Sequence, residues 1–318
     1  MNTIKGRRIL VTGGTGFVGS HLVDALVTAG ARVVVPYRSL DPFSYFRTRG
    51  LDKKVILAQC DLKDRRRIVD LVTKYEIEDI FHLGAQPIVD TAYTNPVETI
   101  ETNVMGTTHI LDAAWMSGTV KRIIVTSSDK AYGKSQETYT EESPLLGDHP
   151  YEASKSAADM ITRAYAKTYN APVVLVRFGN IYGPGDLNQS RIIPGIIQAA
   201  LTGDVLPIRS DGTFVRDYVY VDDVVSAYLF LIERVESQAG TVFNIAGDTT
   251  ISVIDLIKKA QRILGVKIPY RIENSQKNEI PYQHLSWEKI RTLGWKPEYA
   301  LSDGLKETYE WYKTNRIG

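Results

Sequence analysis

A glycine-rich turn lies between a predicted strand and a predicted helix at the start of the chain. The apolar run Arg8–Thr12 precedes it, the turn GGTGFVG occupies residues 13–19, and helical and strand patterns follow at 21–28 and 31–35. This order predicts a βαβ unit. Small residues let backbone N–H groups approach a phosphate at a helix N-terminus, so the turn favours dinucleotide binding over a plain turn without a ligand.

The same alternation of strands and helices continues along the first half of the chain. Apolar runs predict strands at 54–59, 79–83, 122–126 and 173–177, and amphipathic patterns predict helices at 65–74 and 96–117. Strands that alternate with helices form a doubly wound parallel sheet. The sequence therefore predicts an α/β Rossmann-type domain.

The pattern changes after about residue 178. Residues 179–185 are predicted to form a loop, and shorter helical patterns follow at 191–201, 224–232 and 253–264, with a strand at 241–245. We predict a dinucleotide-binding domain over 1–178, to which parts of 217–246 return. A smaller, interleaved α/β substrate domain is predicted over 179–318.

Bulk composition excludes several classes of protein. The 318 residues are 43% hydrophobic and 24% charged, with a net charge of +1. Near-neutrality argues against a nucleic-acid or anionic-membrane partner, and no apolar run approaches the ~20 residues of a membrane span. Cys60 is the only cysteine, and it and the five histidines show no metal-ligand spacing. With no signal-peptide pattern, we expect a cytoplasmic protein without a metal.

A cluster of polar residues follows the strand predicted at 122–126. Ser128, Asp129 and Lys130 lie just past its carboxyl end, where open α/β sheets place their ligands. Tyr151 and Lys155 are four residues apart at the start of the next helical pattern, so they share one helix face. These five residues are predicted to form an active site, whereas a lone Tyr-x-x-x-Lys pattern could also be a surface pair.

This set of residues suits the oxidation of an alcohol. The ordinary pKa of tyrosine, about 10, is too high for a base at neutral pH. The ammonium of Lys155 and the positive ring of an oxidised nicotinamide both favour the phenolate of Tyr151. Ser128 could bind the same hydroxyl, so the three residues can take a proton from an alcohol as hydride leaves.

The residues after the second and third strands bear on the cofactor. An NAD site usually has Asp or Glu after the second strand, to hold the ribose 2′-OH. Here Arg38 occupies this region and no acid occurs before Asp41, which favours NADP over NAD. A solvated loop arginine is the alternative. Asp61 and Leu62, after the third strand, are candidates for contact with adenine.

Motifs along nearly the whole chain resemble a known family. GGTGFVGSHL, HLGAQP, TNVMGT, SSDKAYG, YEASK, RFGNIYGPGD and RDYVYVDD occur in the order found in extended short-chain dehydrogenases/reductases that act on nucleotide sugars. The resemblance implies a Rossmann domain with a small C-terminal nucleotide-sugar domain. It also implies a homodimer formed through helices of the Rossmann domain.

The resemblance also implies binding residues. Those for the cofactor are Gly13, Thr15, Gly16, Phe17, Val18, Gly19, Arg38, Asp61, Leu62, Leu83, Ala85, Asn103, Tyr151 and Lys155. Those for a nucleotide-diphosphate hexose are Gln86, Ser128, Asn180, Arg191 and Arg216. Arginine suits bidentate contact with a diphosphate, although Arg216 could instead pair with the adjacent Asp217.

Within that family the pair Asp129–Lys130 resembles the acid–base pair of 4,6-dehydratases, and the neighbouring motifs look most like CDP-glucose 4,6-dehydratase. The resemblance implies that Tyr151 deprotonates the sugar O4 hydroxyl, Lys130 removes the C5 proton and Asp129 protonates the departing C6 hydroxyl. The product would be a 4-keto-6-deoxyhexose.

Three alternatives remain open at this point. Asp129 and Lys130 could be a solvated loop ion pair, worth less than about 1 kcal/mol. The enzyme would then be a 4-epimerase or 4-keto reductase. A catalytically silent dinucleotide-sensing protein is the non-enzyme alternative. The sequence leaves the base and the sugar open.

Overall fold

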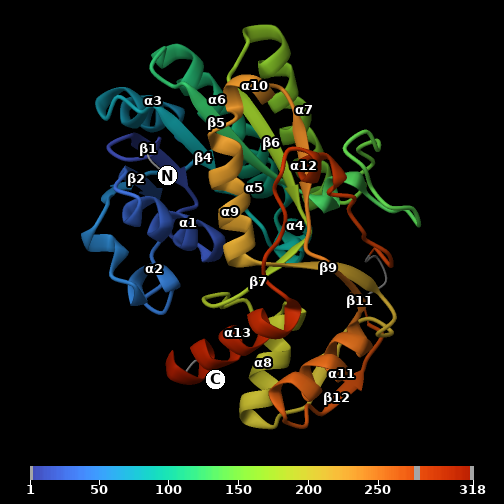
Figure 1. Ribbon diagram of the computed structural model, residues 1–318. Coiled ribbons are helices and arrows are strands. Elements are labelled where there is room, and N and C mark those ends of the chain that lie inside the picture. Colours follow the sequence, from blue (N-terminus) through green and yellow to red (C-terminus); the bar gives the residue numbers. More distant parts are fainter. Residues whose placement is uncertain (1–2, 276–279, 316–318) are drawn as a thin grey trace. The chain divides into compact units, whose positions relative to one another are not determined.

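The computed structural model describes residues 3–275 and 280–315, and the chain forms two compact units (Figure 1). The first unit comprises Met1–Gly133, Glu141–Phe178 and Val225–Asn244. The second comprises Lys134–Thr140, Gly179–Val224 and Ile245–Gly318.

A seven-stranded parallel sheet forms the centre of the first unit, in the order β10-β6-β5-β4-β1-β2-β3. The predicted Rossmann-type fold is confirmed. The strand bounds are β1 Arg8–Thr12, β2 Arg32–Tyr37, β3 Ile56–Gln59, β4 Asp79–His82, β5 Arg122–Ser128, β6 Val173–Phe178 and β10 Val242–Ile245.

Helices cover both faces of this sheet (Figure 1). One face packs on α3 (Arg65–Lys74), α6 (Gly106–Ser117) and α7 (Pro150–Tyr169) through a buried cluster that includes Leu10, Ile80 and Ile123. On the other face the ring of Tyr228 in α9 (Val221–Ile232) contacts Phe81 and Phe178. Because neighbouring residues of a strand point to opposite faces, the strands are mostly apolar on both faces, as expected for a sheet buried on both sides. His82 in β4 and Arg177 in β6 are exceptions.

The helices of the first unit are α1 Phe17–Thr28, α2 Tyr45–Thr48, η1 Leu51–Lys53, α3 Arg65–Lys74, α4 Val89–Thr94, α5 Pro96–Ile100, η2 Glu101–Met105, α6 Gly106–Ser117, η3 Asp129–Tyr132, α7 Pro150–Tyr169 and α10 Val235–Gln238. Helix α9 (Val221–Ile232) starts in the second unit and ends in the first. One long helix was predicted over 96–117. The structure interrupts it with the π-helical turn η2, an irregularity often found at functional sites.

The second unit is a smaller α/β assembly. A three-stranded sheet has the order β11-β9-β7 and a two-stranded sheet pairs β12 with β8. Its elements are β7 Asn180–Tyr182, α8 Ile192–Thr202, β8 Leu206–Ile208, β9 Val215–Tyr220, β11 Thr249–Ser252, α11 Val253–Leu264, β12 Tyr270–Ile272, α12 Glu288–Thr292 and α13 Leu301–Asn315.

Two local predictions are corrected here. Residues 179–185 were expected to be a loop, but Asn180–Tyr182 forms β7, which pairs with β9 from Tyr218 to Tyr220. Helix α9 was expected from 224 and begins at Val221. No helix within residues 3–275 and 280–315 combines the length and apolar character needed to span a membrane.

The glycine turn packs against its own helix at van der Waals limits. A Cβ on Gly19, in α1, would lie 2.1 Å from the carbonyl oxygen of Gly13. Gly13 itself has φ +68°, and a Cβ there would lie 2.8 Å from the backbone nitrogen of Gly84. Both obstacles are backbone atoms, so only glycine fits without a shift of the turn.

We therefore predict that Gly19→Ala lowers the free energy of unfolding by about 3 kcal/mol, the upper end of overpacking costs. Gly195→Ala in α8 is the matched control. There the only close neighbour of the new Cβ would be the flexible end of Leu206, at 2.9 Å, with the Gln189 carbonyl at an ordinary 3.5 Å, and alanine has the better helix propensity. Urea unfolding measures both. Equal midpoints for the two variants would contradict the prediction.

Candidate active site

The acid–base residues occupy a short turn at the end of β5. Ser128 is the last residue of the strand, and Asp129 and Lys130 open the 3₁₀ turn η3. The Ser128 hydroxyl donates to Asp129 Oδ1 at 3.0 Å and accepts from the Lys130 backbone N–H at 3.3 Å. Lys130 Nζ lies 3.3 Å from Asp129 Oδ1. Asp129 is buried and Lys130 is partly exposed, so the pair is more than a solvated loop contact.

Helix α7 carries the predicted proton-transfer pair. Its N-cap is His149, whose Nδ1 accepts from the Tyr151 backbone N–H at 3.2 Å, and Pro150 occupies the first turn. Proline at this place is typical because its missing N–H would have no helical partner. Tyr151 and Lys155, four residues apart, are both buried. The predicted shared helix face is therefore an inward face.

Burial determines the protonation of Lys155. Desolvation lowers the pKa of its ammonium to about 8, because a charge in a low-dielectric interior is disfavoured. Its Nζ donates to the Thr126 carbonyl of β5 at 3.4 Å. This contact holds the end of the lysine side chain against the strand that leads to Ser128.

An amide network joins the loop after β4 to α7. The Gln86 backbone N–H donates to Asn103 Oδ1 at 2.7 Å, and Asn103 Nδ2 donates to the Gln86 carbonyl at 3.1 Å and to Ser154 Oγ at 2.9 Å. The Gln86 side-chain amide donates to Thr99 Oγ1 and to the Ile88 carbonyl. Asn103 lies in η2, so the π-helical turn orients a residue that fastens two parts of the site.

His82 fixes the carboxyl ends of β1 and β4. Its two ring nitrogens lie 2.7 Å from Thr12 Oγ1 and 2.9 Å from Thr107 Oγ1. Thr12 Oγ1 also accepts from the Gly84 backbone N–H at 3.0 Å. Burial lowers the pKa of His82 to about 3, with a further decrease from the charge of Lys155. The ring is therefore a neutral structural link next to the glycine turn.

The glycine turn offers a fit for a pyrophosphate. Gly16 is the N-cap of helix α1, which has no side-chain cap and no acid in its first turn. Its first N–H groups, from Phe17 to Gly19, thus lack a capping side chain, and Thr15 lies in the turn before them. Such a helix N-terminus favours anions. Leu83 and Ala85 lie on either side of Gly84, which closely approaches Gly13.

One of the residues predicted for the adenosine end, Arg38, belongs to an ion cluster. Arg38 Nη1 lies 3.1 Å from Glu98 Oε1, and Lys63 Nζ lies 2.6 Å from Glu98 Oε2. Asp61 Oδ1 accepts from the Lys63 backbone N–H at 2.9 Å. The Leu62 side chain would lie 2.9 Å from a Cβ on Gly84. Asp61 and Leu62 thus lie near the glycine loops, and Arg38 already pairs with a carboxylate.

The second unit holds the remaining candidates. Asn180 Nδ2 donates to the Asp217 carbonyl at 3.3 Å, and Arg191 Nη1 lies 3.2 Å from Asp186 Oδ2. Arg216 Nη1 donates to the carbonyls of Val215 and Pro281 at 2.9 and 3.3 Å.

The side chain of Asp217 has other partners than its neighbour in sequence. It accepts from the Leu285 backbone N–H at 2.6 Å, from Thr250 Oγ1 at 2.6 Å and from His284 Nδ1 at 2.9 Å. Side chains of adjacent strand residues point to opposite faces. The carboxylate of Asp217 is thus bonded to groups of β11 and of the segment around His284.

A family description, the NAD dependent epimerase/dehydratase family, matches residues 9–246. The chain belongs to this family. It is similar to dTDP-glucose 4,6-dehydratase 1 of Escherichia coli, with 31% identity over 97% of this chain and 93% of the relative. It also matches a trifunctional UDP-glucose 4,6-dehydratase/epimerase/reductase of Arabidopsis thaliana, with 32% identity over 99% of this chain. The chain spans 48% of the length of that relative.

Solved structures show the same architecture. The dTDP-glucose 4,6-dehydratase DesIV of Streptomyces venezuelae, with NAD and a thymidine diphosphate bound, has a TM-score of 0.88 and 30% identity. The match covers 97% of this chain and 98% of that one. The UDP-glucose 4-epimerase of Thermotoga maritima has a TM-score of 0.89 and 30% identity, over 97% and 99%. The relatives therefore include both dehydratases and epimerases.

Sequence reasoning missed three residues of the site. Glu98 and Lys63 are 35 positions apart, and no local pattern indicates that they meet. His82 ends a strand, where an apolar residue was equally compatible with the pattern. The polar residues at the carboxyl ends of β1 and β4 were the only sequence signal for His82, because those ends share one edge of the sheet.

We predict that Lys155→Met stabilises the cofactor-free protein at pH 7 by about 3 kcal/mol. The folded-state pKa, about 8, lies below the ordinary 10.5, and each pKa unit corresponds to about 1.4 kcal/mol. The cost of the buried charge is thus full below pH 8 and disappears as the pH rises towards 10.5. The advantage of the variant should shrink over that range.

Lys167→Met is the control for this prediction, because Lys167 is exposed on the same helix. It should leave the pH dependence of unfolding unchanged. Chemical denaturation at several pH values measures both variants. A Lys155→Met protein less stable than the wild type at pH 7 would show that the ammonium makes net favourable contacts.

Proposed function

We propose that this protein is a nucleotide-sugar 4,6-dehydratase, which converts a nucleotide-diphosphate hexose into its 4-keto-6-deoxy form. The observation that carries the proposal is the contact between Asp129 and Lys130, on the turn directly after Ser128. Elimination of water needs an acid and a base, and this pair supplies both. The dehydratases among the relatives support the assignment.

The oxidation half of the reaction uses the residues on α7 and the end of β5. Tyr151 takes the proton of the O4 hydroxyl, and the ammonium of Lys155 favours its phenolate. Ser128 holds the same hydroxyl by a hydrogen bond. A nicotinamide cofactor, held at the glycine turn of residues 13–19, would supply the acceptor for the C4 hydride and the donor of hydride to C6. The 4-keto group makes the C5 proton acidic.

The elimination half uses Asp129 and Lys130. Lys130, as a neutral amine, removes the C5 proton, and protonated Asp129 donates to the C6 oxygen as the C6–O bond breaks. Because the two side chains are in direct contact, a proton can shift from the ammonium to the carboxylate to prepare this state. Lys130 then returns its proton to C5, and Tyr151 and Asp129 exchange protons with solvent.

The substrate class follows from the family. We propose that Arg191 and Arg216 bind the diphosphate, with Asn180 as a neutral donor. The side-chain amide of Gln86 already forms hydrogen bonds with Thr99 and Ile88. Any role of Gln86 in substrate binding would therefore come from its position in the loop.

We also propose a homodimer. The helices α5 to α7 expose a group of large apolar side chains, which are Val97, Ile100, Trp115, Met116 and Met160, and such patches mark interfaces.

The single cysteine is buried and its pKa is raised to about 11, mainly by burial, so it is an unreactive thiol. We propose a cytoplasmic location.

For the cofactor we propose NAD. The NADP preference expected from Arg38 is not supported by the family or by the neighbours solved with NAD. In the structure Arg38 contacts Glu98, which also pairs with Lys63. A 2′-phosphate near Arg38 would meet the negative charge of Glu98, whereas a 2′-hydroxyl would not.

The cofactor proposal predicts that Glu98→Gln shifts binding towards NADP by about 2–5-fold, in line with the ≤1 kcal/mol typical of exposed pairs. The change removes the carboxylate that Arg38 and Lys63 share, and the repulsion with it. Calorimetry with both cofactors measures it, and Glu288→Gln, which breaks a remote surface pair with Arg291, is the control. Tighter NADP binding by the wild type would make Arg38 a phosphate ligand.

The dehydratase proposal predicts distinct effects in the two halves of the reaction. Tyr151→Phe should slow C4 oxidation roughly 10²–10⁴-fold. Lys130→Ala and Asp129→Asn should still reduce the bound cofactor when given substrate, yet release no water. Nicotinamide absorbance in a single turnover, deuterium uptake at C5 and mass spectrometry of the product are the measurements.

A panel of nucleotide hexoses tests the wild type first. Inversion at C4 without deuterium at C5 would make the protein an epimerase with a loop salt bridge. Binding of the cofactor without any reduction by a sugar would favour the silent dinucleotide-sensing alternative. Lys134→Ala, a lysine exposed just beyond the turn, is the matched control and should behave like the wild type.

A further inference from the structure

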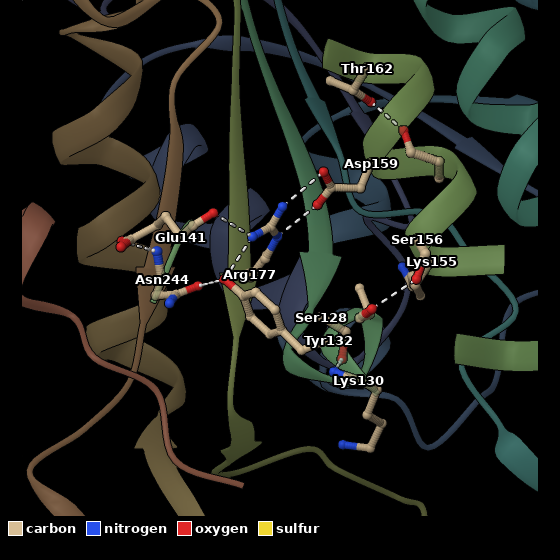
Figure 2. Close-up of polar contacts among 12 residues, drawn as sticks. Ser128, Lys130, Tyr132, Glu141, Lys155, Ser156, Asp159, Thr162, Arg177 and Asn244 are labelled. Atoms are coloured by element: carbon tan, nitrogen blue, oxygen red, sulfur yellow. Dashed lines mark hydrogen bonds and ion pairs between the residues drawn. The ribbon is translucent and has the colours of Figure 1, made fainter. Parts of the chain in front are cut away.

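A buried charged cluster lies behind the acid–base turn (Figure 2). Arg177 on β6 is fully buried, and its guanidinium forms two parallel bonds with Asp159 of α7, at 2.7 and 2.9 Å. A buried ion pair is weak evidence for stability, because desolvation offsets its attraction, but it can fix one arrangement of a structure.

The guanidinium also reaches the last residue of the turn. Arg177 Nη1 donates to the Tyr132 hydroxyl at 2.6 Å, and this hydroxyl donates to Asn244 Oδ1 at 2.7 Å. Burial raises the pKa of Tyr132 to about 12, so the phenol stays neutral and keeps its donor. Tyr132 is two residues from Lys130, whose side chain points away from the cluster in Figure 2.

A second bond ties the turn to the same helix. Ser156 Oγ donates to the Ala131 carbonyl at 2.8 Å. Asp159 lies four residues after Lys155 and eight after Tyr151, so the inward face of α7 carries all three. Through Ser156 and through Asp159, Arg177 and Tyr132, α7 thus holds the turn at two points.

The turn has less support of its own than its neighbours. Ser128 belongs to β5 and is in register with Phe178 of β6, and Tyr151 and Lys155 belong to a 20-residue helix. Asp129 and Lys130 lie instead on a four-residue 3₁₀ turn that ends at Gly133, with φ +75°. Loss of the ties would therefore move the acid–base pair more than the residues that oxidise C4.

We propose that Arg177, Asp159 and Tyr132 position Asp129 and Lys130, and so control elimination of water separately from oxidation at C4. These three are positioning residues that act through the turn. The inference rests on the proposed dehydratase function. It adds that the acid and base depend on a buried network that the oxidation step does not require.

Tyr132→Phe tests this inference. The variant keeps the ring, over which the Arg177 guanidinium lies at 4.7 Å, and removes the hydroxyl through which Arg177 hydrogen-bonds to the turn. In single turnovers with the nucleotide hexose that the wild type dehydrates, the rate of cofactor reduction should stay within about twofold. Deuterium uptake at C5 and release of water should slow about 10–100-fold, as expected for a small misplacement of reacting groups.

Two further variants make the test decisive. Ser156→Ala removes the other tie and should give the same selective loss even if Tyr132→Phe is poorly folded. Tyr228→Phe is the matched control, because it removes a buried hydroxyl that bonds Thr126 at 2.7 Å and not the turn. It should leave the ratio of the two rates unchanged.

The outcomes separate the two proposals. A wild type that never releases water from any nucleotide hexose overturns the proposed function, and the positioning role with it. A wild type that does so, with both steps slowed equally or neither slowed in Tyr132→Phe and Ser156→Ala, overturns the positioning role alone.

Discussion

The parallel pairing of β5 with its two neighbours holds the functional groups of the first unit together. The register with β6 continues to Ser128, opposite Phe178, so the strand stays rigid up to the residue before the acid–base turn. The register with β4 aligns Val125 with His82. In a parallel sheet all carboxyl ends share one edge, and the glycine turn, the β4 loop and the acid–base turn therefore meet there.

Buried polar groups at this edge are stabilised by one another. His82 stays neutral and links Thr12 to Thr107. Asn103 hydrogen-bonds to both the backbone N–H and the carbonyl of Gln86. Lys155 has one backbone carbonyl as its protein partner among the described hydrogen bonds, and burial lowers its pKa. Such a buried lysine lowers the stability of the fold, and shifted pKa values of this kind cluster at functional sites.

The sequence predicted most of the first unit because its strands are buried on both faces and read as continuous apolar runs. Strand β1 and helix α3 have the predicted bounds. The π-helical turn η2 within the predicted helix 96–117 has no such signal, since its pattern stays helical. Strand β7 was missed because three residues between glycines look like a loop, and only pairing with β9 makes them a strand.

The candidate site shows the same division between local and distant information. Tyr151 and Lys155 could be placed on one helix face from their spacing alone. Arg38 was interpreted from its position after β2, but its partner Glu98 is 60 residues away. The same holds for Arg177, which reads as one more strand residue and whose partners Asp159 and Tyr132 lie 18 and 45 positions distant. Side-chain pairing across distant segments depends on the fold and has no local signature.

This chain is similar to both dehydratases and epimerases, so its fold alone does not determine which of the two reactions it catalyses. The dehydratase DesIV and the Thermotoga epimerase match it with TM-scores of 0.88 and 0.89 at the same identity. A shared scaffold supports the shared step, oxidation at C4, and fold alone does not decide function. The second step requires a proton to leave C5 and another to reach the C6 oxygen, which Tyr151 and Lys155 on α7 do not supply. We therefore propose that the difference between the two reactions resides in the short turn that carries Asp129 and Lys130, and in the contacts that hold that turn in place.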